Sequence, residues 1–240
     1  MMLLELLNEV VDIDTDIFLS LNRMHSPFFD YFMSTYSGKW IWIPMYAAIW
    51  YVMLRNFHWK VTLFCMVGLA LVITIADQTG ATLIRPYVER LRPSNLENPI
   101  SDMVHIVNGR RGGRYGFPSC HAANTFALTV FLSLLFKNKS LTFMLIFWAI
   151  LNSYSRIYLG VHYPGDILFG TLAGCLIGYL MYLLYSFIHK RIFHQPRCIS
   201  NKYTASGYLI NDINLLFTVL LLTYFMIILL GFITAHTLNL

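Results

Sequence analysis

Long runs of apolar residues, separated by short polar segments, constrain the fold of this chain more than any other feature. Six runs stand out, at residues 39–54, 61–79, 121–136, 140–155, 166–188 and 213–235. The last two are long enough to cross a hydrocarbon core of about 30 Å, and the shorter ones approach the lower limit of about 17 residues. The runs lack the alternation of barrel strands, and a bilayer requires every backbone polar group to be paired within the protein. The sequence therefore predicts an all-α integral membrane bundle of about six transmembrane helices.

The composition agrees with a membrane protein. The chain is 57% hydrophobic and 12% charged, whereas a soluble domain carries about 25% charged residues. Its net charge of +5 is small, and no basic stripe interleaved with aromatic residues is present, which argues against a nucleic-acid partner. We expect one membrane domain over residues 1–240.

Residues 1–37 differ from the six runs because acidic residues recur among the apolar ones. Leucines alternate with Glu5 and Glu9, phenylalanines alternate with Asp16 and Asp30, and Pro27 is expected to divide the segment. Amphipathic helices of this kind lie along the membrane interface. We therefore predict an N-terminal interfacial segment, with an additional packed span as the alternative.

The basic residues of the loops predict the orientation. With six spans, residues 80–120 and 156–165 lie on one side of the membrane and three short loops lie on the other. The short loops hold no acidic residue. Their basic residues are Arg55, Lys60, Lys137, Lys139, Lys190, Arg191, Arg197 and Lys202. Phosphate binding would explain most basic residues on the opposite side. The positive-inside rule then predicts a multi-pass protein of the cytoplasmic (inner) membrane, with residues 80–120 and 156–165 facing the periplasm or the outside.

Residues suited to phosphate chemistry gather where the apolar runs end, in segments 85–93, 117–121 and 155–166. The predicted topology brings all three to one membrane face. The guanidinium groups of Arg85, Arg92 and Arg156 match phosphate oxygens and stay charged. Ser119 precedes an expected helix start, where unpaired N–H groups favour an anion.

Two histidines and one aspartate add proton and nucleophile chemistry. His162 is suited to nucleophilic attack near neutral pH. Asp166, four residues later, is placed to accept a hydrogen bond from the ring and to fix its tautomer. His121 is then free to protonate the departing oxygen. The other arginines of the same face fit the binding of anionic lipid headgroups as well as they fit this site: Arg90, Arg110, Arg111 and Arg114.

The spacing of these residues resembles the type 2 phosphatidic acid phosphatases, a family related to the vanadium haloperoxidases. The chain reads Arg85-x6-Arg92-Pro93, Pro118-Ser119-Cys120-His121 and Ser155-Arg156-x5-His162-x3-Asp166. The family patterns are Lys-x6-Arg-Pro, Pro-Ser-Gly-His and Ser-Arg-x5-His-x3-Asp, and the resemblance covers residues 80–185.

The resemblance implies a catalytic set and a phosphate-binding set. His162 would form a phosphohistidine, Asp166 would orient it, and His121 would be the general acid. The residues implied to bind phosphate are Arg85, Arg92, Ser119, Cys120 and Arg156. No metal or other cofactor is implied. Arg85 stands where the family has lysine, which changes donor geometry, and Cys120 stands where it has glycine, so a backbone donor there carries a side chain.

We therefore expect a membrane phosphatase that hydrolyses a lipid phosphomonoester or diphosphate. Candidate substrates are undecaprenyl diphosphate, lipid A phosphate, phosphatidylglycerol phosphate and phosphatidic acid, and loop 94–117 is expected to select among them. No obligatory protein partner is indicated. Two alternatives remain open: a phosphotransferase that passes the phosphoryl group to a second lipid, and a non-catalytic lipid-binding membrane protein.

Overall fold

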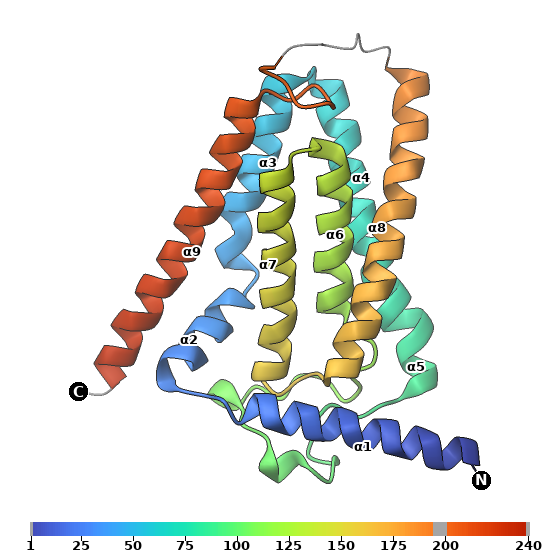
Figure 1. Cartoon of the computed structure of the whole chain (residues 1–240), viewed down its shortest axis with the longest axis vertical. Coiled ribbons are helices and arrows are strands. Elements are labelled where there is room, and N and C mark those ends of the chain that lie inside the picture. Colours follow the sequence, from blue (N-terminus) through green and yellow to red (C-terminus); the bar gives the residue numbers. More distant parts are fainter. Residues whose placement is uncertain (1, 194–200, 239–240) are drawn as a thin grey trace.

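The computed structural model describes residues 2–193 and 201–238, and the regular structure in these ranges is helical, without β-strands. Six helices of the described chain run side by side as a bundle (Figure 1). Each overlaps one predicted apolar run: α3 (Ile43–Asn56), α4 (Trp59–Gln78), α6 (Cys120–Phe136), α7 (Lys139–Tyr158), α8 (Pro164–Ile192) and α9 (Ile210–Leu238). The predicted all-α fold is confirmed. Arg197, which the orientation argument counted, lies outside the described residues.

Three stretches of the described chain are long and apolar enough to cross a membrane, namely Trp59–Val88, Pro164–Ile192 and Ile210–Thr237, and the apolar helix α6 is shorter. The prediction of six spans therefore stays a prediction. Large apolar side chains on the outside of the bundle, such as Leu172 and Phe232, are more than half exposed. Such a surface suits a lipid environment, in which exposed apolar area carries no hydration cost.

The helical rod that begins with α4 continues beyond the expected end of its apolar run. A π-helical turn, η2 (Thr79–Ile84), and a short helix, α5 (Arg85–Val88), follow directly. We expected Arg85 in a loop, and this expectation was wrong. Pro86 occupies an early helix position, where its missing N–H costs nothing, so it does not end the rod. Arg85 is consequently held on a helix and not on a loop.

Helices α6 and α8 pack so closely that the contact positions on α8 have no room for a side chain. A Cβ atom on Gly170, Gly174 or Gly178 would collide with backbone carbonyl oxygens of α6 or its N-cap. Small residues spaced four apart let two helix backbones approach in this way. The contact brings the N-terminal ends of both helices together, and the Ser119 amide donates to the Asp166 carbonyl oxygen at 3.1 Å.

The N-terminal segment forms two helices that separate at Pro27, as predicted: α1 (Met2–Asn22) and α2 (Pro27–Tyr36). Ser26 caps α2 by accepting a hydrogen bond from the Phe29 amide at 3.4 Å. Figure 1 shows α1 lying across the lower end of the bundle, roughly perpendicular to the long helices. A short turn, η1 (Trp40–Trp42), joins α2 to α3.

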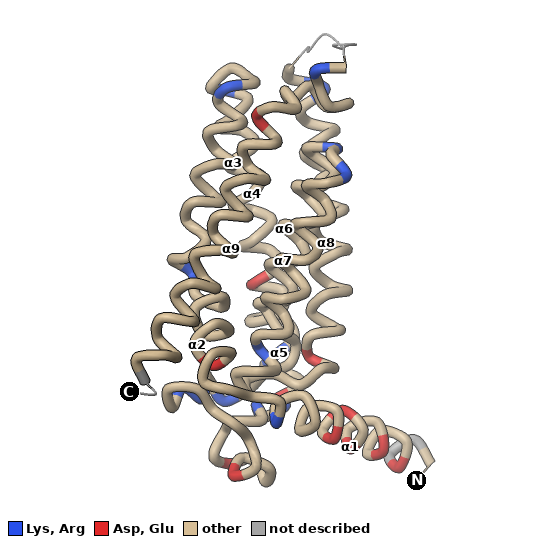
Figure 2. Tube along the Cα trace, turned by 60° about the vertical axis from the view of Figure 1, so that its left-hand side comes forward, with Lys and Arg blue, Asp and Glu red and all other residues tan. Residues whose placement is uncertain are grey.

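The long connection between α5 and α6 covers the same end of the bundle. It contains two short 3-10 turns, η3 (Ser101–Met103) and η4 (Val107–Gly109). A bridge between Leu91 and Tyr115 ties its two ends together. Figure 2 shows basic residues at both ends of the bundle, with acidic residues along α1.

Candidate functional site

The three predicted segments meet at the end of the bundle that α1 crosses. Arg85 lies on α5, Ser119 caps α6, and Arg156 lies in the last turn of α7. His162 lies in the turn between α7 and α8, and Asp166 lies in the first turn of α8. The prediction that distant segments converge on one face of the bundle is confirmed in the described part of the chain.

The turn before α8 places His162 against Asp166. Pro164 starts the helix, so the Asp166 carboxylate points back toward the N-terminus, where its Oδ2 accepts from the Tyr163 amide at 3.1 Å. The same oxygen lies 3.2 Å from His162 Nδ1. Both side chains are buried, with Asp166 fully inaccessible. The spacing of four residues therefore produces the predicted contact.

Arg92 contacts the other nitrogen of the His162 ring. Its Nη1 lies 2.9 Å from His162 Nε2 and donates to the Val161 carbonyl oxygen at 3.0 Å. A guanidinium can only donate, so Nε2 must be the unprotonated nitrogen and Nδ1 must carry the proton that Asp166 accepts. The two partners together select one neutral tautomer.

The electrostatic surroundings keep the His162 ring neutral. Burial, followed by the charges of Arg92, Arg156 and Arg85, holds the pKa of His162 well below its usual 6.5. Burial and the neighbouring Arg85 also lower the pKa of Arg92 to about 10. Arg92 nevertheless stays charged at neutral pH, so a neutral imidazole faces fixed positive charge.

Arg90 was expected to contact either lipid headgroups or the site, and it lies inside the site. Its Nη1 is 3.0 Å from Asp166 Oδ1, and its Nη2 is 2.7 Å from Asp14 Oδ2. The guanidinium also lies 3.9 Å above the Tyr163 ring. Asp14, on α1, accepts in addition from the Gly165 amide at 2.7 Å. The N-terminal helix thus helps to hold Asp166, which the sequence patterns gave no means of predicting.

The two departures from the family pattern contact each other. Arg85 Nη2 lies 3.0 Å from Cys120 Sγ and donates to the Pro118 carbonyl oxygen at 3.1 Å. A Cβ atom at Gly80 would lie 2.9 Å from that sulfur. The glycine in the π-helical turn therefore makes room for a cysteine side chain. Ser119 is fully buried, and its hydroxyl accepts from the Ala122 amide at 3.4 Å.

Two arginines keep donors that the protein does not use. The buried Nε atoms of Arg85 and Arg156 have no hydrogen-bond partner in the described part of the chain. Arg156 donates through Nη1 to the Ser37 hydroxyl. Buried polar groups are normally paired. The positive charges of Arg85, Arg92 and Arg156 all lower the pKa of the same histidine, His162. This arrangement suits a tetrahedral oxyanion at His162.

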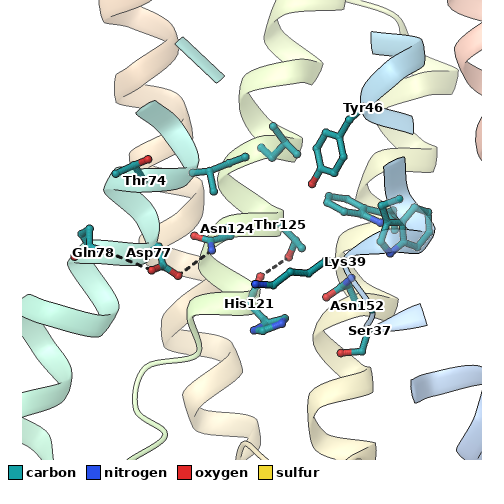
Figure 3. A pocket seen from close by; sticks show the side chains of 15 residues that line it. Ser37, Lys39, Tyr46, Thr74, Asp77, Gln78, His121, Asn124, Thr125 and Asn152 are labelled. Carbon is teal, nitrogen blue, oxygen red and sulfur yellow. Dashed lines mark hydrogen bonds between the residues drawn. The ribbon is translucent and has the colours of Figure 1, made fainter. Parts of the chain in front are cut away.

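His121 is not hydrogen-bonded to His162 within the described residues. It instead faces a cavity of about 580 Å³ between α3, α4, α6 and α7. Figure 3 shows His121 at one end of this cavity, Asp77 and Asn124 on one side, and Lys39 with Asn152 on the other. Ser37, which Arg156 contacts, also lines it. The cavity therefore adjoins the arginine cluster.

Polar and aromatic groups share the walls of this cavity. Asp77 accepts from Asn124 Nδ2 at 3.2 Å, while the Oδ1 atoms of Asn124 and Asn152 are buried without a partner in the described chain. Trp42 and Trp148 contribute aromatic surface. No sequence motif marks any of these residues, because each lies within or beside an apolar run.

Two other arginines of the covering loop have partners within that loop. Arg111 donates to the Ser94 carbonyl oxygen at 2.8 Å, and Arg114 pairs with Glu97 at 2.6 Å. Both residues of the Arg114–Glu97 pair are more than half exposed. Arg111 and Arg114 therefore order the loop. The Arg114 carbonyl oxygen accepts from the Arg92 amide at 3.0 Å, but the Arg111 and Arg114 guanidinium groups bind loop residues and not the His162 cluster in the described part of the chain.

Comparisons with known proteins agree on one family. A family model described as the PAP2 superfamily matches residues 59–190. A lipid A 4'-phosphatase of Bacteroides thetaiotaomicron is 57% identical over 173 residues, which cover 72% of this chain and 77% of that protein. A lipid A 4'-phosphatase of Porphyromonas gingivalis is 35% identical over 184 residues, which cover 76% of this chain and 77% of that protein.

A solved structure shares the fold. It is a transmembrane PAP2-type phosphatidylglycerolphosphate phosphatase from Bacillus subtilis, with a TM-score of 0.56 and 21% identity. The match covers 79% of this chain and 90% of that one.

Proposed function

Because this chain belongs to the PAP2 superfamily and is a lipid phosphatase of the membrane, we propose that it removes a phosphate monoester from lipid A through a covalent intermediate on His162. The supporting observation is the pairing of its ring, with Nδ1 against buried Asp166 and Nε2 against Arg92. The names of the two similar enzymes favour lipid A among the candidate substrates.

In the first step, His162 Nε2 attacks phosphorus. The Arg92 N–H that contacts Nε2 turns to a phosphoryl oxygen, and Arg85 and Arg156 offer their unused Nε donors to the others. Donors already in place stabilise the charge that develops on these oxygens. Asp166 holds the Nδ1 proton and stabilises the positive ring as the N–P bond forms.

The leaving oxygen departs toward the cavity. The P–O bond to the sugar breaks, and His121 gives to that oxygen a proton that its ring takes up as the negatively charged phosphate binds beside it. In the second step, water attacks phosphorus, the N–P bond breaks, and His121 takes the proton from water. Its place in the cavity wall, beside the arginine cluster, allows both transfers.

The cavity would hold the saccharide of the substrate. Asp77 and the unpaired amide oxygens of Asn124 and Asn152 can accept from hydroxyl or amide groups, while Trp42 and Trp148 present apolar faces. Its volume of about 580 Å³ is within the range of about 300–1,000 Å³ for small-molecule pockets. The acyl chains would lie against the exposed apolar surface of the helices.

A substrate panel tests this proposal. The purified protein, treated with a chelator, is given lipid A, undecaprenyl diphosphate, phosphatidylglycerol phosphate and phosphatidic acid, and released phosphate is measured. We expect lipid A to have the highest kcat/KM, and Asn124→Ala to slow lipid A more than phosphatidic acid. Full turnover by His162→Ala, faster hydrolysis of undecaprenyl diphosphate, or transfer of the phosphate to a second lipid would each contradict the proposal.

We further place the site on the periplasmic or outer face of the cytoplasmic membrane, with α1 at the interface. The short loops at the opposite end supply the basic residues that the positive-inside rule assigns to the cytoplasm. On α1, Leu6, Val10, Ile13 and Ile17 form an exposed apolar stripe suited to an interface. In intact spheroplasts, an impermeant thiol reagent should label Arg114→Cys and not Lys139→Cys, and the reverse pattern would contradict this orientation.

A further inference from the structure

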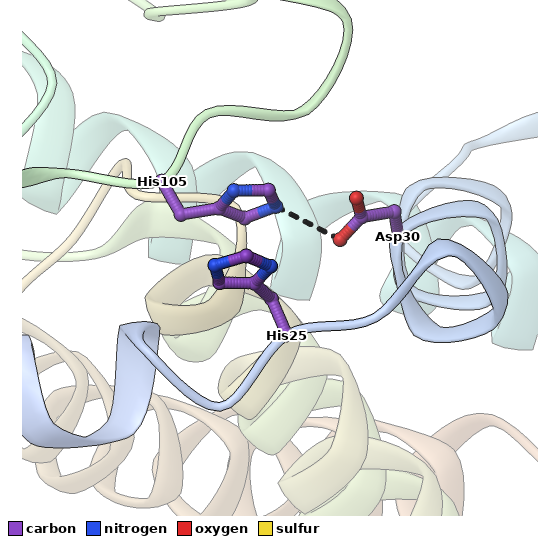
Figure 4. A group of neighbouring side chains, drawn as sticks. All are labelled: His25, Asp30 and His105. Carbon is purple, nitrogen blue, oxygen red and sulfur yellow. Dashed lines mark hydrogen bonds and ion pairs between the residues drawn. The ribbon is translucent and has the colours of Figure 1, made fainter.

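A second cluster of ligand-type side chains lies outside the His162 site. It consists of His25 in the turn between α1 and α2, Asp30 in the first turn of α2, and His105 in the loop that covers the bundle. One ligand atom from each residue lies within 4.8 Å of the other two. Three separate segments of the chain therefore converge on one point (Figure 4).

The side chains present their donor atoms to the same space. The two imidazole rings stack with 3.7 Å between centroids and an interplanar angle of 1°. His105 Nε2 lies 2.9 Å from Asp30 Oδ1, and Figure 4 shows a nitrogen of each ring on the side of the Asp30 carboxylate. Among the described residues, the ion pair found at Asp30 is the one with His105. Two imidazoles and one carboxylate suit a divalent transition metal.

Surrounding groups hold two of these residues in place. The Tyr158 hydroxyl donates to Asp30 Oδ1 at 2.6 Å. Asn22, which is 1% exposed, accepts from the His105 amide at 2.7 Å and donates to the Tyr158 carbonyl oxygen at 2.9 Å. Hydrogen bonds of this kind orient the ligands of metal sites in proteins. His25 is exposed and sits on a turn, so it is free to adjust.

We propose that His25, Asp30 and His105 bind one Zn²⁺ ion, with water as the fourth ligand. Bonds of about 2.0–2.2 Å place tetrahedral ligand atoms about 3.4 Å apart. The most distant pair in the cluster therefore has to close by at most about 1.4 Å, which a rotation of the exposed His25 side chain supplies. The ion replaces the proton shared between His105 and Asp30.

The site goes beyond the proposed function, because it is separate from the phosphate chemistry. The metal joins the α1–α2 turn and the first turn of α2 to the covering loop, and the Tyr158 hydroxyl of α7 holds Asp30. The carbonyl of His105 also packs against Gly160, two residues before His162. The bound ion thus fixes the loop beside the nucleophile without contacting the reacting groups.

Zinc binding is tested on the full-length protein in detergent after chelator treatment. Bound Zn²⁺ is measured by equilibrium dialysis and atomic emission, with the visible spectrum of Co²⁺ as a second readout. We expect about one ion per chain, with the affinity at least about tenfold weaker in His25→Ala and in His105→Ala. His58→Ala, at the opposite end of the bundle, is the matched control and should bind like the wild type.

The variants are separated from misfolding by a second measurement. His25 is exposed, so His25→Ala should keep the wild-type helical content by circular dichroism. Zn²⁺ should raise the thermal midpoint of the wild type and of His58→Ala, and leave that of His25→Ala unchanged. Absence of saturable binding to the wild type, or equal binding by His25→Ala and His105→Ala, would overturn the proposal.

Discussion

Replacing Arg90 by glutamine should impair both folding and turnover, because Arg90 is the cation that faces the buried carboxylate of Asp166. The side chain of Asp166 is 0% exposed, and Arg90 Nη1 lies 3.0 Å from its Oδ1. Removal of one partner from a buried ion pair costs about 3–5 kcal/mol. For a chain of this size, that loss lowers the thermal midpoint by about 6–20 °C. If the His162–Asp166 contact consequently stabilises the transition state by about 2.7 kcal/mol less, kcat/KM falls about 100-fold.

The matched control is Arg114→Gln, in the same loop. Arg114 pairs with Glu97, and both side chains are more than half exposed, so solvent screens the interaction and its loss should change little. Thermal unfolding in detergent and phosphate release from lipid A are measured for both variants and for Arg90→Lys, which should recover part of the loss. If Arg90→Gln unfolds and turns over like Arg114→Gln, the role assigned to Arg90 is wrong.

Three further changes have distinct expected results. Gly174→Ala should lower the thermal midpoint by several degrees because its methyl group meets the Ala123 carbonyl oxygen, whereas Gly113→Ala, with open space around it, should not. Cys120→Gly should keep turnover within a few-fold, since Arg85 keeps its bond to the Pro118 carbonyl oxygen; a loss above tenfold would show that the sulfur is needed. The lowered pKa of His162 keeps the attacking ring neutral below pH 6.5, so the fall of kcat/KM on the acid side should occur below that pH. In Arg92→Gln this fall should move to higher pH, because the charge of Arg92 helps to lower the pKa of His162. An unmoved fall would contradict the electrostatic assignment.

The helices could be predicted from local apolar patterns, and the convergence of the site could be predicted from the order of the spans. Apolar runs determine where helices form in a bilayer, and a spacing of four residues brings Asp166 to His162 around a helix start. The helical extension after α4 could not be predicted in the same way. Gly80, Arg85 and Pro86 are typical of a loop, and only the structure shows that Pro86 falls at an early helix position and that Gly80 makes room for Cys120.

The residues that support the site depended on contacts between distant segments. Arg90 lies in the same basic loop as Arg114, and nothing in their sequence neighbourhoods separates the buried ion pair from the exposed one. Asp14 lies in the N-terminal segment, for which the sequence predicted only an amphipathic character. Its contact with Arg90 depends on how α1 crosses the bundle, which requires tertiary structure to predict. The same holds for Asn124 and Asn152, whose place in a cavity wall has no sequence signature.

The central claim, that His162 carries the phosphoryl group, is tested by trapping the intermediate. The protein is mixed with lipid A labelled in its phosphate groups, quenched in alkali during the first turnover, and digested for mass spectrometry. We predict the label on the peptide that contains His162, on one nitrogen of that ring, and no labelled protein in His162→Ala. Label on a different residue, or equal labelling of His162→Ala, would contradict the mechanism.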